Sequence, residues 1–178
     1  MNGLVIYKGK YGATKQYAMW IGKELQLTVA SADRFPVDEL PKYDYIILGS
    51  SVYIGKLEIK DWLKKNFQVL QNKKIFFFQV AGSPAEQIEK RESYNKASLS
   101  HTILENLQFY YLPGRMLLRN LSGWDRFMLK IGAKLTKDPI EKKTMLTDFD
   151  NVKKENIFPI IEAVRTFRKI KEPEMNLV

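Results

Sequence analysis

Short apolar segments alternate with helical patterns along most of this 178-residue chain, and this alternation limits the fold more than any other feature. The segments expected to form strands are residues 3–7, 27–30, 45–49, 75–80 and 109–112. The helical patterns are residues 14–25, 59–70, 86–106 and 154–169. Strands that are apolar throughout must be covered on both faces. The pattern therefore predicts an α/β fold in which helices wrap both sides of a parallel sheet, and residues 1–178 are expected to form a single domain.

The first expected strand leads into the first helix through a loop with two glycines and two lysines. The loop consists of Lys8, Gly9, Lys10, Tyr11, Gly12, Ala13 and Thr14. A strand that turns into a helix leaves backbone N–H groups unpaired at the helix start, and these donors attract anions together with the helix dipole. Lys8 and Lys10 add positive charge, and the Thr14 hydroxyl is expected to cap the helix or to donate to a phosphate oxygen. The loop suits a phosphate site and also an ordinary capped turn.

Two further loops rich in small residues follow the third and fourth expected strands. One consists of Ser50, Ser51, Val52, Tyr53, Ile54 and Gly55, and the other consists of Ala81, Gly82, Ser83 and Pro84. Ligands of parallel sheets bind beyond the carboxyl ends of the strands, at the point where the strand order reverses. Small side chains let a flat ligand approach the backbone. Three such loops at one edge of a sheet therefore favour a cofactor that carries a phosphate group.

The spacing of the glycines argues against two common nucleotide-binding loops. A Walker A loop has four residues between its glycines and a hydroxyl residue after its lysine, whereas five residues separate Gly49 from Gly55 and Leu57 follows Lys56. The pattern G-x-G-x-x-G is absent from the first loop. An ATPase or a nicotinamide-dependent dehydrogenase is therefore not expected, and a mononucleotide remains.

Composition excludes several other kinds of site. The chain has no cysteine and one histidine, His101, so disulfides, thiol nucleophiles and thiolate or histidine-rich metal sites are not expected. The net charge of +9 favours acidic partners, but no basic face interleaved with aromatics indicates nucleic-acid binding. No stretch is apolar enough to span a bilayer, and the first residues lack the order of a signal peptide. A cytoplasmic protein is expected.

Four stretches resemble a known family. Residues 11–21 (YGATKQYAMWI) resemble the first cofactor loop and helix of flavodoxin-domain proteins, and residues 44–56 (DYIILGSSVYIGK) resemble their second loop. Residues 124–130 (WDRFMLK) and 147–149 (TDF) are similar to the flavodoxin-type menaquinone-dependent protoporphyrinogen dehydrogenases. The resemblance covers nearly the whole chain. It implies a flavodoxin-like, doubly wound, five-stranded parallel sheet in the order 2-1-3-4-5 that binds FMN.

The resemblance also implies a role for each loop. The FMN phosphate would lie on residues 9–14, and the ribityl chain and ring would lie against residues 50–55 and 81–83. Tyr53 is the aromatic residue expected to stack on the flavin ring. Flavodoxin phosphate loops usually carry Ser or Thr where this chain has Lys8, Gly9 and Tyr11. Fewer hydroxyl groups are therefore expected to hold the phosphate, with the two lysines supplying charge instead.

Two functions follow from the resemblance. One is an FMN-dependent oxidoreductase of the protoporphyrinogen dehydrogenase type, which oxidises a reduced tetrapyrrole and passes electrons to a quinone. The other is a carrier that moves electrons between partner proteins. Residues 114–143 form a basic amphipathic insertion that a simple carrier does not need. No acid–base pair identifies catalytic residues, and Asp125 and Arg126, which are adjacent and do not face each other along a helix, are interpreted as structural.

The insertion is expected to contain one amphipathic helix over residues 117–135. Its apolar stripe would consist of Leu117, Leu121, Trp124, Met128, Ile131 and Leu135, with Phe127 beside it. Its basic residues are Arg119, Arg126, Lys130, Lys134 and Lys137. This pattern suits a helix that lies on the anionic inner face of a membrane. The simpler alternative is a helix that packs on the sheet edge or on a second copy in a homodimer, and residues 137–143 are expected to be a solvated loop.

Overall fold

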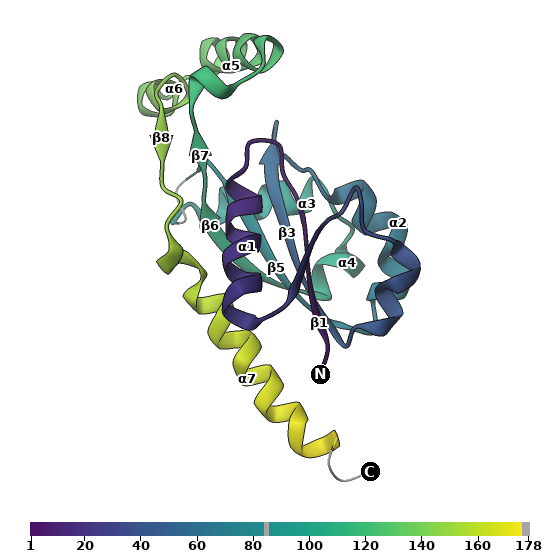
Figure 1. Ribbon diagram of the computed structural model, residues 1–178. Helices are drawn as coiled ribbons and strands as arrows, with labels where there is room; N and C mark the ends of the chain where they lie inside the picture. The colour runs from purple at the N-terminus through teal and green to yellow at the C-terminus, as the bar shows by residue number, and fades with distance from the viewer. Residues whose placement is uncertain (84–85, 176–178) are drawn as a thin grey trace.

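Five parallel strands form the centre of the computed structural model, which describes residues 1–83 and 86–175 (Figure 1). The strands are β1 (Gly3–Lys8), β2 (Thr28–Ser31), β3 (Tyr45–Tyr53), β5 (Lys74–Ala81) and β6 (Leu107–Pro113), in the order β2-β1-β3-β5-β6. Every neighbouring pair in this order is parallel. The strand order reverses between β1 and β3, where ligands of such sheets bind. The predicted doubly wound sheet is confirmed.

Helices cover both faces of the sheet because successive strand residues point to opposite sides. Val5 and Ile47 belong to the core on one face, and Leu4 and Ile46 belong to the core on the other. The first face is covered by α1 (Ala13–Leu25) and α7 (Phe158–Met175), and the second by α2 (Lys60–Leu70), α4 (His101–Glu105) and the 3₁₀ helix η1 (Val37–Lys42). The continuous apolar strands of the sequence thus serve two separate hydrophobic layers.

Three consecutive phenylalanines in β5 show how the two layers are filled. Phe76 and Phe78 are buried on the α1 face, and Phe77 is buried on the opposite face. Gly49 lies beside Phe78 in the sheet, and a Cβ on Gly49 would come within 2.0 Å of the Phe78 ring. The glycine therefore leaves room for the aromatic side chain. Each side chain buried in this way contributes about 1.5–3 kcal/mol, so this region carries much of the stability of the fold.

The insertion after β6 projects from the carboxyl end of the sheet (Figure 1). It consists of β7 (Arg115–Met116), the 3₁₀ helix η2 (Leu118–Asn120), α5 (Gly123–Leu135), α6 (Pro139–Met145) and β8 (Phe149–Asp150). β7 and β8 pair in an antiparallel ribbon that carries the helices away from the sheet. The chain then returns through the 3₁₀ helix η3 (Lys154–Ile157) to α7. The predicted helical insertion is confirmed, but the ribbon extends it to residues 115–150.

The single helix predicted over residues 117–135 is wrong in its first part. α5 begins at Gly123, where the Ser122 side chain accepts a hydrogen bond from the Asp125 N–H at 3.1 Å and caps the helix. Leu117 and Leu121 precede this cap and have extended backbone conformations, so they do not continue the helical stripe. The loop predicted over residues 137–143 is also wrong, because most of it belongs to α6.

The other predicted helix and strand boundaries lie closer to those of the structure. The helical pattern over residues 86–106 forms two helices, α3 (Ile88–Lys96) and α4. β3 continues to Tyr53, so residues 50–53 of the second predicted loop are strand. Pro84 of the third predicted loop lies outside the described residues. Within the described part of the chain, none of the helices has both the length and the apolar character that crossing a bilayer requires.

Candidate functional site

The turn from β1 into α1 holds a buried hydroxyl group that forms no hydrogen bond with any described residue. Gly12 precedes the helix in a left-handed conformation with φ of 86°, and no side chain in the described part of the chain caps the helix. The N–H groups of the first helical turn have no partners within the helix. Thr14 lies in this turn and is buried, and its Oγ1 has no hydrogen-bond partner among the described residues. The prediction that Thr14 caps the helix is wrong because Thr14 lies inside it, and its unpaired hydroxyl suits an anion.

Gly9 keeps the space beside Thr14 open. A Cβ on Gly9 would lie 2.6 Å from Thr14 Oγ1 and 3.2 Å from Ser51 Oγ. A serine or threonine at position 9 would therefore collide with Thr14, which explains why the hydroxyl is missing there. Ser51 Oγ donates a hydrogen bond to the Glu58 carboxylate. Thr14 and Ser51, together with Ala13, line a cavity of about 80 Å³, so two hydroxyl residues and the helix start meet where the phosphate group is expected.

The two lysines of the first loop are held by carboxylates. Lys8 Nζ lies 2.7 Å from Asp33 Oδ1. Lys10 Nζ lies 2.8 Å from Asp125 Oδ2 and 4.4 Å from the centre of the Tyr53 ring. The hydrogen bond to Asp125 raises the pKa of Lys10 above its ordinary value. Much of the positive charge expected from these lysines is therefore balanced by acidic neighbours.

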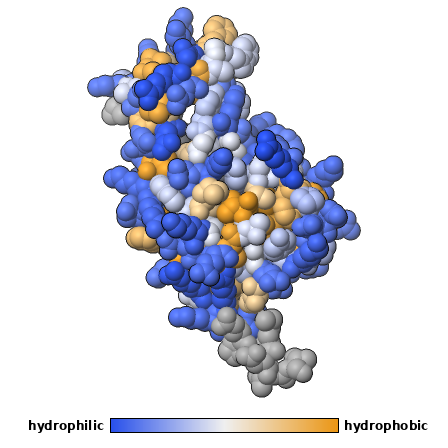
Figure 2. Space-filling view, in the orientation of Figure 1, coloured by the Kyte–Doolittle hydropathy of each residue, from blue (hydrophilic) through white to orange (hydrophobic). Residues whose placement is uncertain are grey.

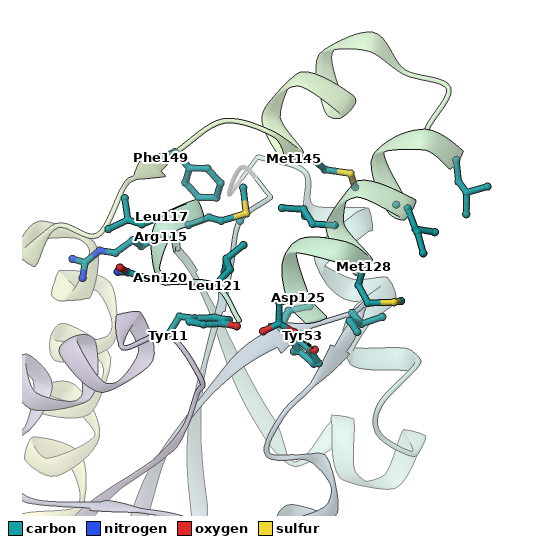
Figure 3. Close-up of a pocket in the computed structure, with 18 residues that line it drawn as sticks. Tyr11, Tyr53, Arg115, Leu117, Asn120, Leu121, Asp125, Met128, Met145 and Phe149 are labelled. Carbon is teal, nitrogen blue, oxygen red and sulfur yellow. Dashed lines mark hydrogen bonds between the residues drawn. The ribbon is translucent and has the colours of Figure 1, made fainter. Parts of the chain in front are cut away.

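Asp125 was interpreted as structural from the sequence, and its place in the candidate site was not predicted. It lies on α5, its side chain is 6% exposed, and its Oδ1 accepts a hydrogen bond from Tyr53 Oη at 2.5 Å. Figure 3 shows Asp125 directed toward Tyr53. The spacing from Ser122 to Asp125 is typical of a helix start, but no local pattern signals a contact with a residue 72 positions earlier. Asp125 therefore joins the insertion to the first and second loops.

An apolar cavity of about 470 Å³ separates the sheet edge from the insertion (Figure 3). The sheet side is formed by Tyr11, Val52, Tyr53, Ile54 and Gly82. The insertion contributes mainly apolar side chains, among them Leu121, Met128, Leu129, Met145 and Phe149, with Arg115, Asn120 and Asp125 as the polar ones. This size and this small number of polar groups are typical of a small-molecule site. Since all three predicted loops border the cavity, they meet at one edge as expected.

The second predicted loop is a tight hairpin. β3 pairs with β4 (Lys56–Leu57) through a turn at Ile54 and Gly55, whose φ angles are 46° and 70°. Ser50 supports this hairpin, since its Oγ donates to the Ser51 carbonyl and accepts from the Ile59 N–H. A β-branched residue at positive φ is strained. The hairpin thus holds Ile54 in an unfavourable backbone conformation at the cavity border.

A buried arginine fixes the third loop from behind. Arg91 of α3 donates from Nη2 to the Ser83 carbonyl at 2.6 Å and from Nη1 to the Leu112 carbonyl at 3.1 Å. Burial lowers the pKa of Arg91. A Cβ on Gly82 would lie 2.9 Å from the Phe149 ring, so Gly82 allows the insertion to approach. Ala81 and Gly82 line the small cavity beside Thr14, and no local sequence pattern predicts that Arg91 holds the loop in place.

Comparison with known proteins gives a family and a set of relatives. Residues 4–143 match the model of a family described as flavodoxin domain. An uncharacterized protein of Methanocaldococcus jannaschii is 34% identical over 87 residues, which cover 47% of this chain and 57% of that protein. The chain therefore spans little more than half the length of this relative.

Solved structures of similar shape include flavodoxins. A flavodoxin from the domain Archaea is 19% identical, with a TM-score of 0.46 over 75% of this chain and 98% of that one. Oxidised Flavodoxin 1 from Bacillus cereus is 18% identical, with a TM-score of 0.47 over 76% of this chain and 100% of that one. Both similarities are to proteins whose sequences have diverged far from this one.

Proposed function

Because this chain belongs to the flavodoxin domain family, we propose that it is an electron-transfer flavoprotein whose cofactor is FMN. The observation that carries the proposal is the buried Thr14 Oγ1, which has no partner among the described residues and lies at the start of α1. A phosphate group at this position would accept hydrogen bonds from that hydroxyl and from the unpaired N–H groups of the first helical turn. When bound, FMN supplies the electron transfer, and the protein holds and orients it.

The two cavities suit the two ends of this cofactor. The small cavity beside Thr14 and Ser51 suits the phosphate end, and the larger apolar cavity suits a flat ring. Tyr11 and Tyr53 line both cavities, so aromatic side chains lie at the boundary between them. Tyr53 is the residue that we propose stacks on the flavin ring. Its hydroxyl group is already held by Asp125, which limits the positions that the Tyr53 ring can take.

The apolar cavity favours an oxidoreductase with its own substrate. A carrier exchanges electrons at an exposed cofactor edge and needs no apolar wall above the ring, whereas here the insertion adds such a wall to a half-open cavity of about 470 Å³. Leu121, Met128 and Phe149 offer an apolar surface beside the proposed ring position. The specific form of the proposal is a protoporphyrinogen dehydrogenase type of enzyme with a quinone acceptor, which residues 124–130 support by resemblance. An electron carrier between partner proteins is the alternative that family membership by itself supports.

Titration of the apoprotein with FMN and with riboflavin tests the cofactor. We expect about one FMN per chain and affinity at least about tenfold higher than for riboflavin, which lacks the phosphate. Thr14→Val keeps the side-chain shape and removes the hydroxyl, so FMN affinity is expected to fall about tenfold while riboflavin affinity stays unchanged. Thr102→Val, at an exposed position of α4, is the matched control and should leave the affinities for FMN and for riboflavin unchanged. Equal affinity of the unsubstituted protein for FMN and riboflavin would contradict the proposal.

The choice between enzyme and carrier is tested by filling the cavity. Met128→Trp adds volume in the cavity wall away from the small phosphate cavity. The reduced, FMN-loaded protein is mixed with a menaquinone analogue or with ferricyanide, and the rate of flavin oxidation is followed. For an enzyme that binds its substrate in the cavity, the substitution slows oxidation by the quinone and leaves oxidation by ferricyanide unchanged. Identical rates for the variant and the unsubstituted protein with both oxidants would favour the carrier.

A further inference from the structure

The outer face of α5 is apolar and lies in solvent. Trp124, Phe127 and Leu135 are 63%, 53% and 77% exposed, and Ile131 also belongs to the exposed apolar residues. These four residues are three or four positions apart, so they form one ridge along the helix. The rings of Trp124 and Phe127 contact each other, with centroids 5.8 Å apart. Figure 2 shows apolar side chains at the surface of the projecting end of the molecule, and a contiguous exposed group of this kind indicates an interaction surface.

A row of basic residues runs beside this apolar ridge. Arg126, Lys130 and Lys134 are exposed and spaced four positions apart on α5. The helix contains a single acidic residue, Asp125, which is buried in the site. Within the described residues, Lys130 and Lys134 have no acidic partner. The exposed charge of α5 is therefore entirely positive and complements an anionic surface.

The ridge continues into the apolar cavity. Ile131 and Leu135 are exposed on the outside of α5 and also line the cavity. An acidic protein partner would complement the basic row but would not require an apolar surface that continues inward. A bilayer with anionic lipids offers both a negative headgroup layer and an apolar interior, and it matches both features.

A second copy of the chain matches the ridge less well. In a symmetric dimer the same patch meets itself, so the ridge of one copy would lie on the ridge of the other. The basic rows beside the two ridges would then be brought close together. Like charges at an interface are unfavourable, and no acidic residue on the exposed surface of α5 offsets them. The charge pattern therefore favours the bilayer over a homodimer.

We propose that α5 docks this protein on an anionic lipid bilayer. The ridge of Trp124, Phe127, Ile131 and Leu135 enters the boundary between headgroups and acyl chains, and the basic row contacts the headgroups. This orientation brings Ile131 and Leu135, which also line the cavity, to the membrane, so a lipid-soluble redox substrate can enter beside them without crossing water. Substrate entry rests on the function proposed above, whereas the docking itself does not.

The test is co-sedimentation with vesicles of phosphatidylcholine alone and with vesicles that also contain phosphatidylglycerol. Binding is expected only with the anionic lipid and is expected to weaken at high salt, because salt screens charges near the surface. The double variant Lys130→Glu with Lys134→Glu should bind at least about twentyfold more weakly. Lys64→Glu with Lys65→Glu makes the same charge change at exposed positions of α2 and should alter binding by less than about twofold. Trp124→Ser with Phe127→Ser should also reduce binding.

Three results would overturn the docking proposal. The first is the absence of binding to any vesicle. The second is an equal loss of vesicle binding in the two double lysine variants, which would mean that net charge alone attracts the protein to the bilayer. The third is a dimer in analytical ultracentrifugation that Trp124→Ser with Phe127→Ser dissociates. Circular dichroism shows that each variant is folded, and FMN titration of the same samples separates the two proposals. A protein that binds FMN but no vesicles loses only the docking, and one that binds vesicles but no FMN loses only the proposed function.

Discussion

The sheet domain and the insertion use apolar side chains in opposite ways. In the sheet, Ile47 and Phe77 are fully enclosed between strands and helices. In the insertion, α5 leaves Trp124 and Leu135 largely exposed and turns Met128 toward a cavity. Apolar area that is buried stabilises a fold, whereas apolar area that faces a cavity or solvent remains available for binding. The sheet therefore carries the stability of the fold, and the insertion keeps apolar surface available for binding.

The largest expected effect is on the stability of the sheet. Phe77→Ala leaves a void in a fully buried position and should lower the free energy of unfolding by about 3–5 kcal/mol. Trp124→Ala removes a larger side chain from an exposed position and should change it by less than about 0.5 kcal/mol. Urea unfolding followed by circular dichroism measures both. Similar losses from the two substitutions would show that α5 is part of the folding core and would contradict this division of roles.

A second and smaller effect is expected when the whole insertion is removed. Its ends lie side by side, since the Asn151 N–H donates to the Gly114 carbonyl at 3.1 Å and Arg115 pairs with Asp150. A short glycine linker can therefore replace residues 115–150. The shortened chain should unfold cooperatively and lose less stability than Phe77→Ala, because domains tolerate insertions where the two ends are close. Circular dichroism during urea unfolding checks this, and a chain that no longer folds would contradict it.

The same contrast explains how much could be predicted from the sequence. The strands and the loops at their carboxyl ends follow local patterns, such as the apolar run around Phe77 and the glycines before Thr14, so their approximate positions could be predicted, although β3 continues through residues 50–53 of the second loop. The start of α5 was missed although Ser122 gives a local capping signal, because the apolar stripe continued past it to Leu117. The contact of Asp125 with Tyr53 could not be predicted, since it depends on how the ribbon turns the insertion back over the sheet edge.

The third prediction concerns that contact. Asp125→Asn removes the negative charge that holds Lys10 and leaves Tyr53 a weaker, neutral acceptor, so the insertion should be held less firmly on the sheet. Global stability should change little because Lys10 is 40% exposed and water can solvate its released charge. Amide hydrogen exchange should become faster in α5 and stay unchanged in β5. Asp61→Asn, which removes an exposed carboxylate on α2, is the control and should leave exchange in α5 unchanged. Unchanged exchange in α5 of Asp125→Asn would show that other contacts hold the insertion.

The smallest expected effect is a pH dependence of the same contact. The hydrogen bond to Asp125 raises the pKa of Lys10 above its ordinary value of 10.5, so the folded protein keeps this proton to higher pH than the unfolded chain does. The contribution of Lys10 is therefore fully present below about pH 10.5 and is lost as the pH rises through the raised pKa.

Lys10→Gln separates this contribution from other groups that titrate in the same range. Burial raises the pKa of Tyr17 and of Tyr45 in the sheet domain, and both tyrosines lower stability at high pH in the variant and in the unsubstituted protein alike. Urea unfolding at a series of pH values should show a small, constant stability margin of the unsubstituted protein over Lys10→Gln up to about pH 10, and a shrinking margin above it. A margin that stays constant would mean that the ion pair of Lys10 with Asp125 does not help to hold the insertion on the sheet.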